Sequence, residues 1–281
     1  MKRWIAVAFC TLMAGVALAG ASDVRKTAEA TMLVTGWIEV APDGGVYNYT
    51  LDRPERIPPS VTDLIKNSVP GWKFNFAQRA DAIQRAKMSL RIVAKPIDDQ
   101  HDALRINSAS FGDANADATE HVTYKDRQPP RYPQEAVQAR VDGTVFLFMR
   151  VNRQGQVQDV AVEQVNLGAY GREAQMHHFR EVLGNAALEA AKKWTYNLPT
   201  TGKHVLDSYW DVRVPVNFNL RVAGTPREDT YGKWEPYIPG PREVIPWQQN
   251  KLQQSSPDAI PAGSISSADQ PLQLMTALGG A

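Results

Sequence analysis

The clearest pattern in the chain is a strict alternation of apolar and polar positions around residue 215. The even positions hold Trp210, Val212, Val214, Val216, Phe218 and Leu220, and the odd positions hold Tyr209, Asp211, Arg213, Pro215, Asn217 and Asn219. This period of two predicts a β-strand with one face in a core and the other in water. Pro215 has no amide hydrogen to give to a ladder, which places the strand at a sheet edge.

An exposed strand edge is a template on which a partner can add its own extended peptide. We therefore predict a partner-binding site on the water-facing positions of this strand. Its residues are Tyr209, Asp211, Arg213, Pro215 and Asn217.

The residues before this strand predict the rest of a small sheet and one helix. Residues 144–151 are apolar at both parities, which is typical of a strand covered on both faces. A hairpin loop with Gly155 leads into a second strand at 157–165. From Phe179 to Trp194 apolar residues recur at steps of three and four, which predicts an α-helix. These elements form a β-β-α-β unit with predicted bounds of 129–221.

The two apolar faces of residues 144–151 need two covers. The helix supplies one, and the other is the tail, the first part of the chain or a second copy in a homodimer. The tail, 222–281, is rich in Pro, Gly, Ser and Gln with aromatic residues between them. We predict that its tryptophans pack on the outer phenylalanines of the strand and that residues from Gln248 onward are disordered. The predicted contact residues are Phe146, Phe148, Trp234 and Trp247.

Residues 30–96 echo the same pattern in shortened form. A hairpin turn at 42–45 is followed by a helix over 61–69 with Ser60 as its cap, and by an alternating strand over 88–94. The tetrads Trp72-Lys73-Phe74-Asn75 and Trp194-Thr195-Tyr196-Asn197 both stand between helix and last strand. We predict an α+β fold of two tandem β-β-α-β units, each a small antiparallel sheet with one helix packed on it. The alternative is that unrelated β-β-α-β segments match by chance.

Residues 97–128 lose apolar character and gain acidic residues, which predicts a solvated linker. The alternative is an added edge strand over 103–111. The carboxylates lack the spacing of a calcium loop, and the neighbouring His177 and His178 would point roughly 100° apart on a helix. We therefore predict no metal site.

The first residues predict a secretory signal over 1–21. Lys2 and Arg3 precede an apolar run, and Ala17-Leu18-Ala19 offers small residues for cleavage. An uncleaved membrane anchor is the alternative. Cys10, the single cysteine, lies in this segment, so the rest of the chain has no disulfide or thiol chemistry.

Charge and motifs exclude several classes of function. The 31 basic and 30 acidic residues nearly cancel, so there is no electrostatic case for nucleic acid. The sequence has no nucleophile elbow, phosphate loop or His-Glu-x-x-His helix. We predict no enzyme activity and no cofactor.

Five features in order resemble the TonB C-terminal domain family. They are Tyr132-Pro133-x-x-Ala136, Gly143-x-Val145, Gly155 with Val157, the alanine-rich helix ending at Trp194, and Val214-Pro215-Val216-x-Phe218. The resemblance implies a periplasmic module that binds the extended peptide of an outer-membrane transporter or another envelope protein by strand addition, in a system driven from the inner membrane. It places residues 30–96 as a degenerate copy of the same unit.

The chain departs from the family because no long Pro-rich spacer precedes Pro129. Partner binding is therefore our prediction, and energy transduction is the alternative that an uncleaved inner-membrane anchor facing the periplasm would restore. A structural or assembly protein of the cell envelope with no open sheet edge is a further alternative.

Overall fold

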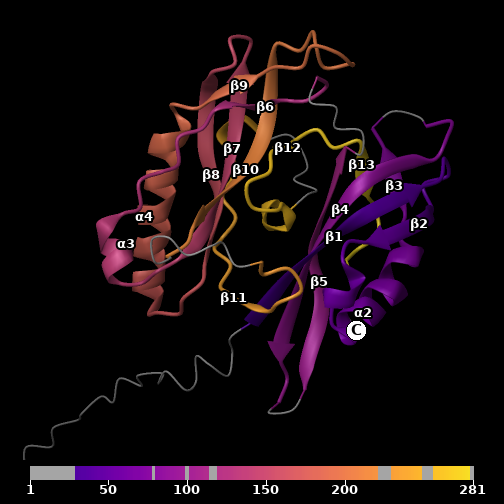
Figure 1. Ribbon diagram of the computed structural model, residues 1–281, viewed down its shortest axis with the longest axis horizontal. Coiled ribbons are helices and arrows are strands. Elements are labelled where there is room, and N and C mark those ends of the chain that lie inside the picture. Colours follow the sequence, from indigo (N-terminus) through magenta and orange to yellow (C-terminus); the bar gives the residue numbers. More distant parts are fainter. Residues whose placement is uncertain are drawn as a thin grey trace, which may run out of the picture.

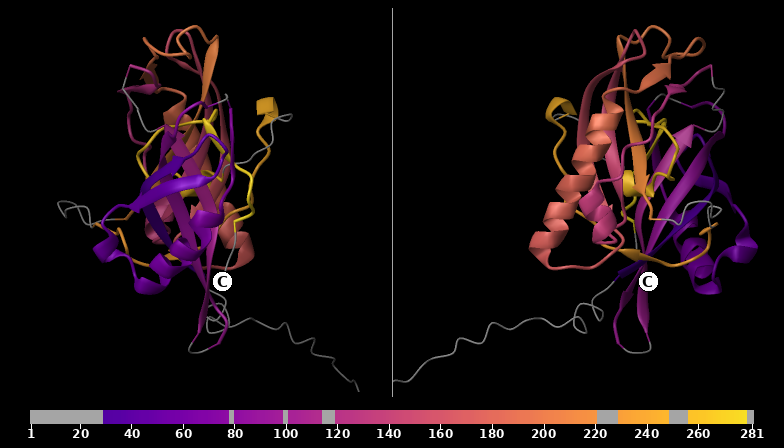
Figure 2. Two further views of the ribbon diagram at one scale, coloured as in Figure 1. Left: turned by 90° about the vertical axis from the view of Figure 1, so that its right-hand side faces the viewer. Right: turned by 60° about the vertical axis from the view of Figure 1, so that its left-hand side comes forward.

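The computed structural model describes residues 29–77, 80–98, 101–113, 119–220, 229–248 and 256–278. Within them the chain has an α+β fold with antiparallel sheets, as predicted. Two sheets lie face to face, with helices on their outer sides and C-terminal residues between them (Figures 1 and 2). We call residues 29–113 the first segment, 119–220 the second segment and 229–278 the tail. The predicted signal, 1–21, lies outside the described residues.

The first segment builds a sheet of strand order β11-β1-β4-β5, with β2 paired to the C-terminal half of β1. The strands are β1 (Glu29–Val40), β2 (Val46–Leu51), β4 (Gln84–Pro96), β5 (Asp102–Asp113) and, from the tail, β11 (Glu235–Tyr237). Helix α2 (Pro59–Ser68) buries Val61, Leu64 and Ile65 in the core of this sheet. The predicted cap at Ser60 is wrong, because the helix begins at Pro59, whose ring nitrogen has no hydrogen that needs a cap.

The second segment builds a sheet of strand order β12-β10-β7-β8. The strands are β7 (Gly143–Asn152), β8 (Val157–Leu167), β10 (Tyr209–Phe218) and, from the tail, β12 (Ser266–Ser267). Helix α4 (Glu173–Ala191) packs Leu183, Ala187 and Ala191 on the outer face of this sheet, which confirms the predicted helix. The short helix α3 (Gln134–Gln138) lies beside α4, and β6 (Thr123–Asp126) pairs with β9 (Thr195–Asn197).

One glycine in each hairpin makes the same contact with the strand that follows the helix. Gly44 has φ 82° and Gly155 has φ 72°, a region that glycine enters without steric cost. A Cβ on either would lie 2.3 Å from a carbonyl oxygen, that of Phe74 in β3 (Phe74–Phe76) or of Tyr196 in β9. In return, the amides of Phe74 and Tyr196 each donate a 2.8 Å hydrogen bond to the glycine carbonyl. The two segments therefore fix hairpin against strand in one common way.

The tail crosses between the two sheets and adds strands to both. Strand β11 pairs with β1, β12 pairs with β10, and β13 (Leu272–Leu274) pairs with β3. The 3-10 helix η4 (Pro257–Ala259) contacts β4, β5, β8 and β10 (Figure 1). The order in residues 256–278 differs from the predicted disorder beyond Gln248. The tail pieces are too short to show a period of their own and are ordered by pairing with distant strands.

A further prediction concerns residues 97–128. Residues 102–113 form β5, so the alternative of an edge strand over 103–111 is confirmed, and 123–126 form β6. No helix in the described ranges is long and apolar enough to cross a membrane.

Candidate functional site

The outer edge of β10 is where the sequence places the partner-binding site. Backbone groups of successive residues in a strand point to opposite sides, so one parity bonds to β7 and the other points away from it. The carbonyl of Asp211 accepts a 2.9 Å bond from the tail amide of Ala268, and the carbonyl of Pro215 accepts a 3.5 Å bond from Arg127. The odd positions therefore point outward, and Pro215 lacks its hydrogen on the edge side without weakening the β7 ladder.

The tail covers part of this edge. Strand β12 pairs Ser266 with Arg213 and Ser267 with Val212. In the same register Ser264 would face Pro215, but its amide donates to Pro261 and its carbonyl accepts from the Tyr124 hydroxyl. Because Pro215 has no hydrogen to give, the ladder ends there. Among the described residues no strand pairs with the outer edge of residues 214–218.

The inner face of β10 is buried, so the predicted water-facing surface is wrong for three of its five residues, Asp211, Arg213 and Pro215. Asp211 is 6% exposed and Arg213 is 4% exposed. Asp211 accepts hydrogen bonds of 2.9 and 3.0 Å from Arg150 and one of 3.3 Å from Gln248. The bond to Asp211 raises the pKa of Arg150 above its ordinary value. The bond from Gln248 links the tail to the sheet.

Arg213 belongs to a buried ion cluster centred on Glu163 of β8. The fully buried Glu163 accepts hydrogen bonds of 2.7 and 3.2 Å from Arg213 and one of 2.7 Å from Arg242 of the tail. The Arg213 guanidinium also lies 5.1 Å from the centre of the Phe148 ring. Buried charges are tolerated when they are paired and hydrogen-bonded, as here.

The remaining predicted edge residues have different surroundings. Tyr209 is 41% exposed, and the Arg150 guanidinium lies 3.8 Å from its ring centre. Pro215 is buried, and Asn217 is exposed with its side-chain oxygen 2.7 Å from the Thr144 hydroxyl. The structure therefore leaves Tyr209 and Asn217 at the surface, one at each end of the strand.

The predicted tail contact is present for one tryptophan of the two. Phe146 and Phe148 are buried, and the Trp247 ring lies 6.1 Å from the Phe148 ring, centre to centre. Trp234 stands elsewhere: it precedes β11 on the first sheet and is 37% exposed. The second cover over residues 144–151 is thus the tail, in the part that follows β11.

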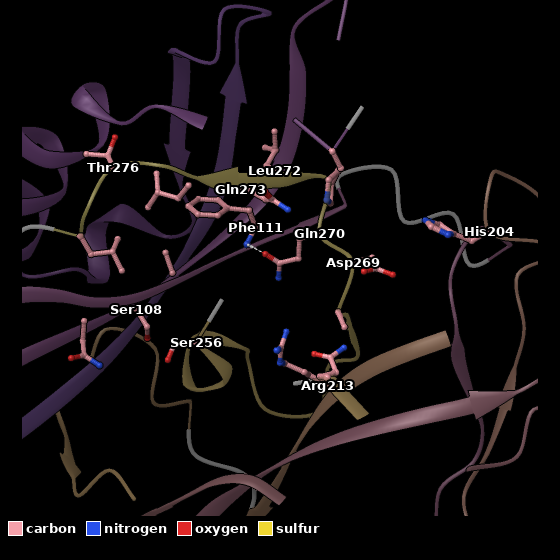
Figure 3. Close-up of a pocket in the computed structure, with 18 of the residues that line it drawn as sticks. Ser108, Phe111, His204, Arg213, Ser256, Asp269, Gln270, Leu272, Gln273 and Thr276 are labelled. Carbon is pink, nitrogen blue, oxygen red and sulfur yellow. Dashed lines mark hydrogen bonds between the residues drawn. The ribbon is translucent and has the colours of Figure 1, made fainter. Parts of the chain in front are cut away.

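Two cavities border the tail just after β12. One of about 670 Å³ is lined by Arg213, Phe111 and Leu272 among others (Figure 3). The other, of about 850 Å³, lies between the first sheet and the start of β10 and is lined by Trp37, Lys87, Tyr124 and Tyr209 among others. Both reach tail residues 269–271, so this stretch stands between two spaces large enough for side chains.

Sequence reasoning missed Glu163, Gln248 and the covering residues Ser266 and Ser267. No local signal marks them, because each acquires its role from a contact more than 35 residues away. In the part of the chain that the structure describes, no group of three or more His, Cys, Asp or Glu side chains could hold a metal ion.

Comparison with known proteins gives one kind of match. The chain is 35% identical over 103 residues to Protein TonB of Xanthomonas campestris pv. campestris strain B100, and equally to that of strain ATCC 33913. The match covers 37% of this chain, which spans 40% of the length of each relative. No protein-family model and no solved structure matches. The resemblance to TonB is confirmed for this part of the chain.

Proposed function

We propose that this chain is a periplasmic, non-catalytic module that binds an envelope protein by accepting its extended peptide at the outer edge of β10. The observation that supports this best is the state of that edge: in the described ranges only Arg213 and Val212 have a strand partner there, on β12. Outward carbonyl and amide groups are what a partner strand binds in this mode of recognition.

The proposal extends the similarity to Protein TonB to a class of partner. We infer that the partner is an outer-membrane transporter or another protein of the cell envelope. Residues 1–21 act as a cleaved signal in this proposal, so the module is exported without a membrane anchor.

We further propose that the two segments are tandem copies of one unit, with bounds of 30–96 and 129–221. In support, β1-β2-α2-β3-β4 and β7-β8-α4-β9-β10 have the same order and pairing. The contacts of Gly44 and Gly155 repeat the same geometry. In this proposal only the second copy binds a partner.

A structural role in the envelope is the second candidate, and the path of the tail favours it. Strands β11, β12 and β13 each lie on an edge that a partner would otherwise use. In this alternative the tail completes the fold, and the edge of residues 214–218 stays unused.

Asn217→Pro separates the two candidates. Asn217 is exposed and its amide points outward, so proline removes an edge donor and leaves the β7 ladder intact. The full chain is used to capture proteins from an envelope extract of its own organism. We expect Asn217→Pro to lose a captured protein that the wild type retains, and Asn217→Ala, which keeps the amide, to retain it.

Circular dichroism on each variant confirms that the sheet is unchanged. Equal capture by all three chains would contradict binding at this edge. Capture of nothing by any of them would favour the structural role.

A further inference from the structure

The first sheet holds both ends of the tail stretch that carries β12. Before β12, the buried Asp258 accepts a 2.6 Å hydrogen bond from Ser108 and one of 2.5 Å from Tyr237, and its carbonyl accepts 2.6 and 2.9 Å bonds from Arg91. Arg91 and Ser108 belong to β4 and β5. One anchor is therefore a buried polar network on the first segment.

After β12, the tail returns to the first segment. The Gln270 side chain accepts a 3.3 Å bond from the amide of Phe111 (Figure 3). It also donates a 3.0 Å bond to the Ser110 hydroxyl. Leu272 is 3% exposed and lies in the first core, where β13 pairs with β3. Residues 260–269 thus form a bridge from one anchor to the other, and β12 is where the bridge touches the second sheet.

The contact of the bridge with β10 is weak compared with its anchors. It consists of the pairs Arg213–Ser266 and Val212–Ser267, the amide bond from Ala268 to Asp211, and partial packing of Ile265 against the second core. Each backbone hydrogen bond contributes on the order of 1 kcal/mol net. These few bonds therefore hold β12 only loosely on β10.

A partner strand needs the same backbone groups that β12 occupies. Beyond β12, the outward groups of β10 are the Pro215 carbonyl, which Arg127 contacts, and the amide and carbonyl of Asn217. Pro215 contributes no donor. A peptide that pairs with the whole strand must therefore take the outward groups of Asp211 and Arg213, and these are bound to the tail.

We propose that β12 occupies the site of the partner strand. The first segment holds β12 across the β10 edge, and an incoming peptide displaces it. This inference rests on the proposed function. The displaced stretch indicates what the peptide looks like, since it shares its site: a β-branched aliphatic residue at the place of Ile265, followed by small side chains as in Ser266, Ser267 and Ala268. The cavities beside residues 269–271 leave room for the exchange.

The test uses a labelled, capped peptide with the sequence of residues 264–270 and the full chain. Ser266→Pro/Ala268→Pro removes the two amides that point to β10. The control Ser266→Ala/Ala268→Ser changes the same side chains and keeps both amides. By fluorescence anisotropy, we expect the proline variant to bind the peptide at least tenfold more tightly than the wild type, and the control to bind like the wild type.

A disulfide that ties β12 to β10, which we call the lock, is expected to prevent peptide binding reversibly. Val212 and Ser267 form a non-hydrogen-bonded pair of the antiparallel ladder. At such a pair the two strands approach closely enough for a disulfide. In a Cys10→Ser background, oxidised Val212→Cys/Ser267→Cys is expected to bind no peptide, and reduction is expected to restore wild-type binding. Equal affinity of wild type, proline variant and oxidised chain, or no binding by the proline variant, would overturn the proposal.

The same chains separate this inference from the proposed function. An envelope protein captured equally by the oxidised and the reduced lock would retain the function and refute displacement. Peptide binding by the proline variant without any envelope capture that depends on Asn217 would retain the displaceable strand and refute the function.

Discussion

Strands β4 and β10 take the same place in their sheets, but their outer edges are closed very differently. The edge of β4 is paired with β5 from Ala86 to Pro96. The corresponding edge of β10 is paired with β12 at Val212 and Arg213, within the described residues. The covering strand β5 has 12 residues, whereas β12 has 2.

The difference shows that a shared order of elements does not leave the same backbone groups unpaired at the edge. A paired edge offers no backbone groups to a partner, whatever the fold around it. In the first segment β5 uses those groups, and its inner face anchors the tail through Ser108 and Ser110. The first segment therefore serves as the support from which the edge of the second is covered.

The largest expected effect comes from removing the apolar anchor of β5, and the matching substitution beside β12 is expected to do much less. Phe111 of β5 packs edge-on against Phe74 and Trp72, with ring centres 4.9 and 5.9 Å apart. We expect Phe111→Ala to lower the free energy of unfolding by about 3 to 5 kcal/mol. Ile265→Ala beside β12 is expected to cost about 1 kcal/mol, because Ile265 is only partly buried.

Urea unfolding of both variants measures this difference. Equal losses would mean that β12 belongs to its core as firmly as β5 does, and the comparison of the two edges would fail.

A second pair of substitutions tests what the two segments share. Gly44→Ala and Gly155→Ala each force a side chain into the left-handed region and against a carbonyl oxygen. We expect each to cost about 2 to 3 kcal/mol, with the two values alike. Gly71→Ala is the control, since a Cβ at Gly71 meets nothing within 4 Å. A loss at one of the two glycines alone would show that the hairpin contacts are not equivalent.

Alkaline pH is expected to weaken the second segment by about 2 kcal/mol through Tyr124. Burial raises the pKa of Tyr124 to about 12, from an ordinary value of 10.0. The folded state thus keeps a proton that the unfolded chain releases, so stability is complete below pH 10 and is lost as the pH rises towards 12. Urea unfolding between pH 9 and 12 measures the loss, which Tyr124→Phe should reduce and the exposed Tyr47→Phe should leave unchanged.

The sequence was sufficient for the strand of residues 209–218 and for helix α4, because each has a period that its own side chains define. It was insufficient for the inner face of β10. Asp211 and Arg213 have the alternation typical of a solvent-exposed face. They are buried because Arg150 and Glu163 supply opposite charges and the tail supplies the amide of Gln248. Such compensation is non-local, so alternation alone cannot distinguish it from exposure.

The tail shows the same limit in stronger form. Strand β12 has two residues and β13 has three, which is less than any hydrophobic period needs. Their order comes from edges formed by residues far earlier in the chain. The Pro215 signal, in contrast, was local: its missing hydrogen lies on the outer side of the strand, although β12 pairs with that edge at Val212 and Arg213.

The pairing of β1 with β11 has a consequence for how the chain folds. Glu29 lies opposite Tyr237, and Phe74 of β3 lies opposite Leu274, so strands of the first segment pair with residues much further along the chain. The β7-β8-α4 region can form from local contacts, whereas the first sheet closes through contacts of very large sequence separation, which form slowly. We therefore expect the addition of β11 and β13 to the first segment to be a late event in folding.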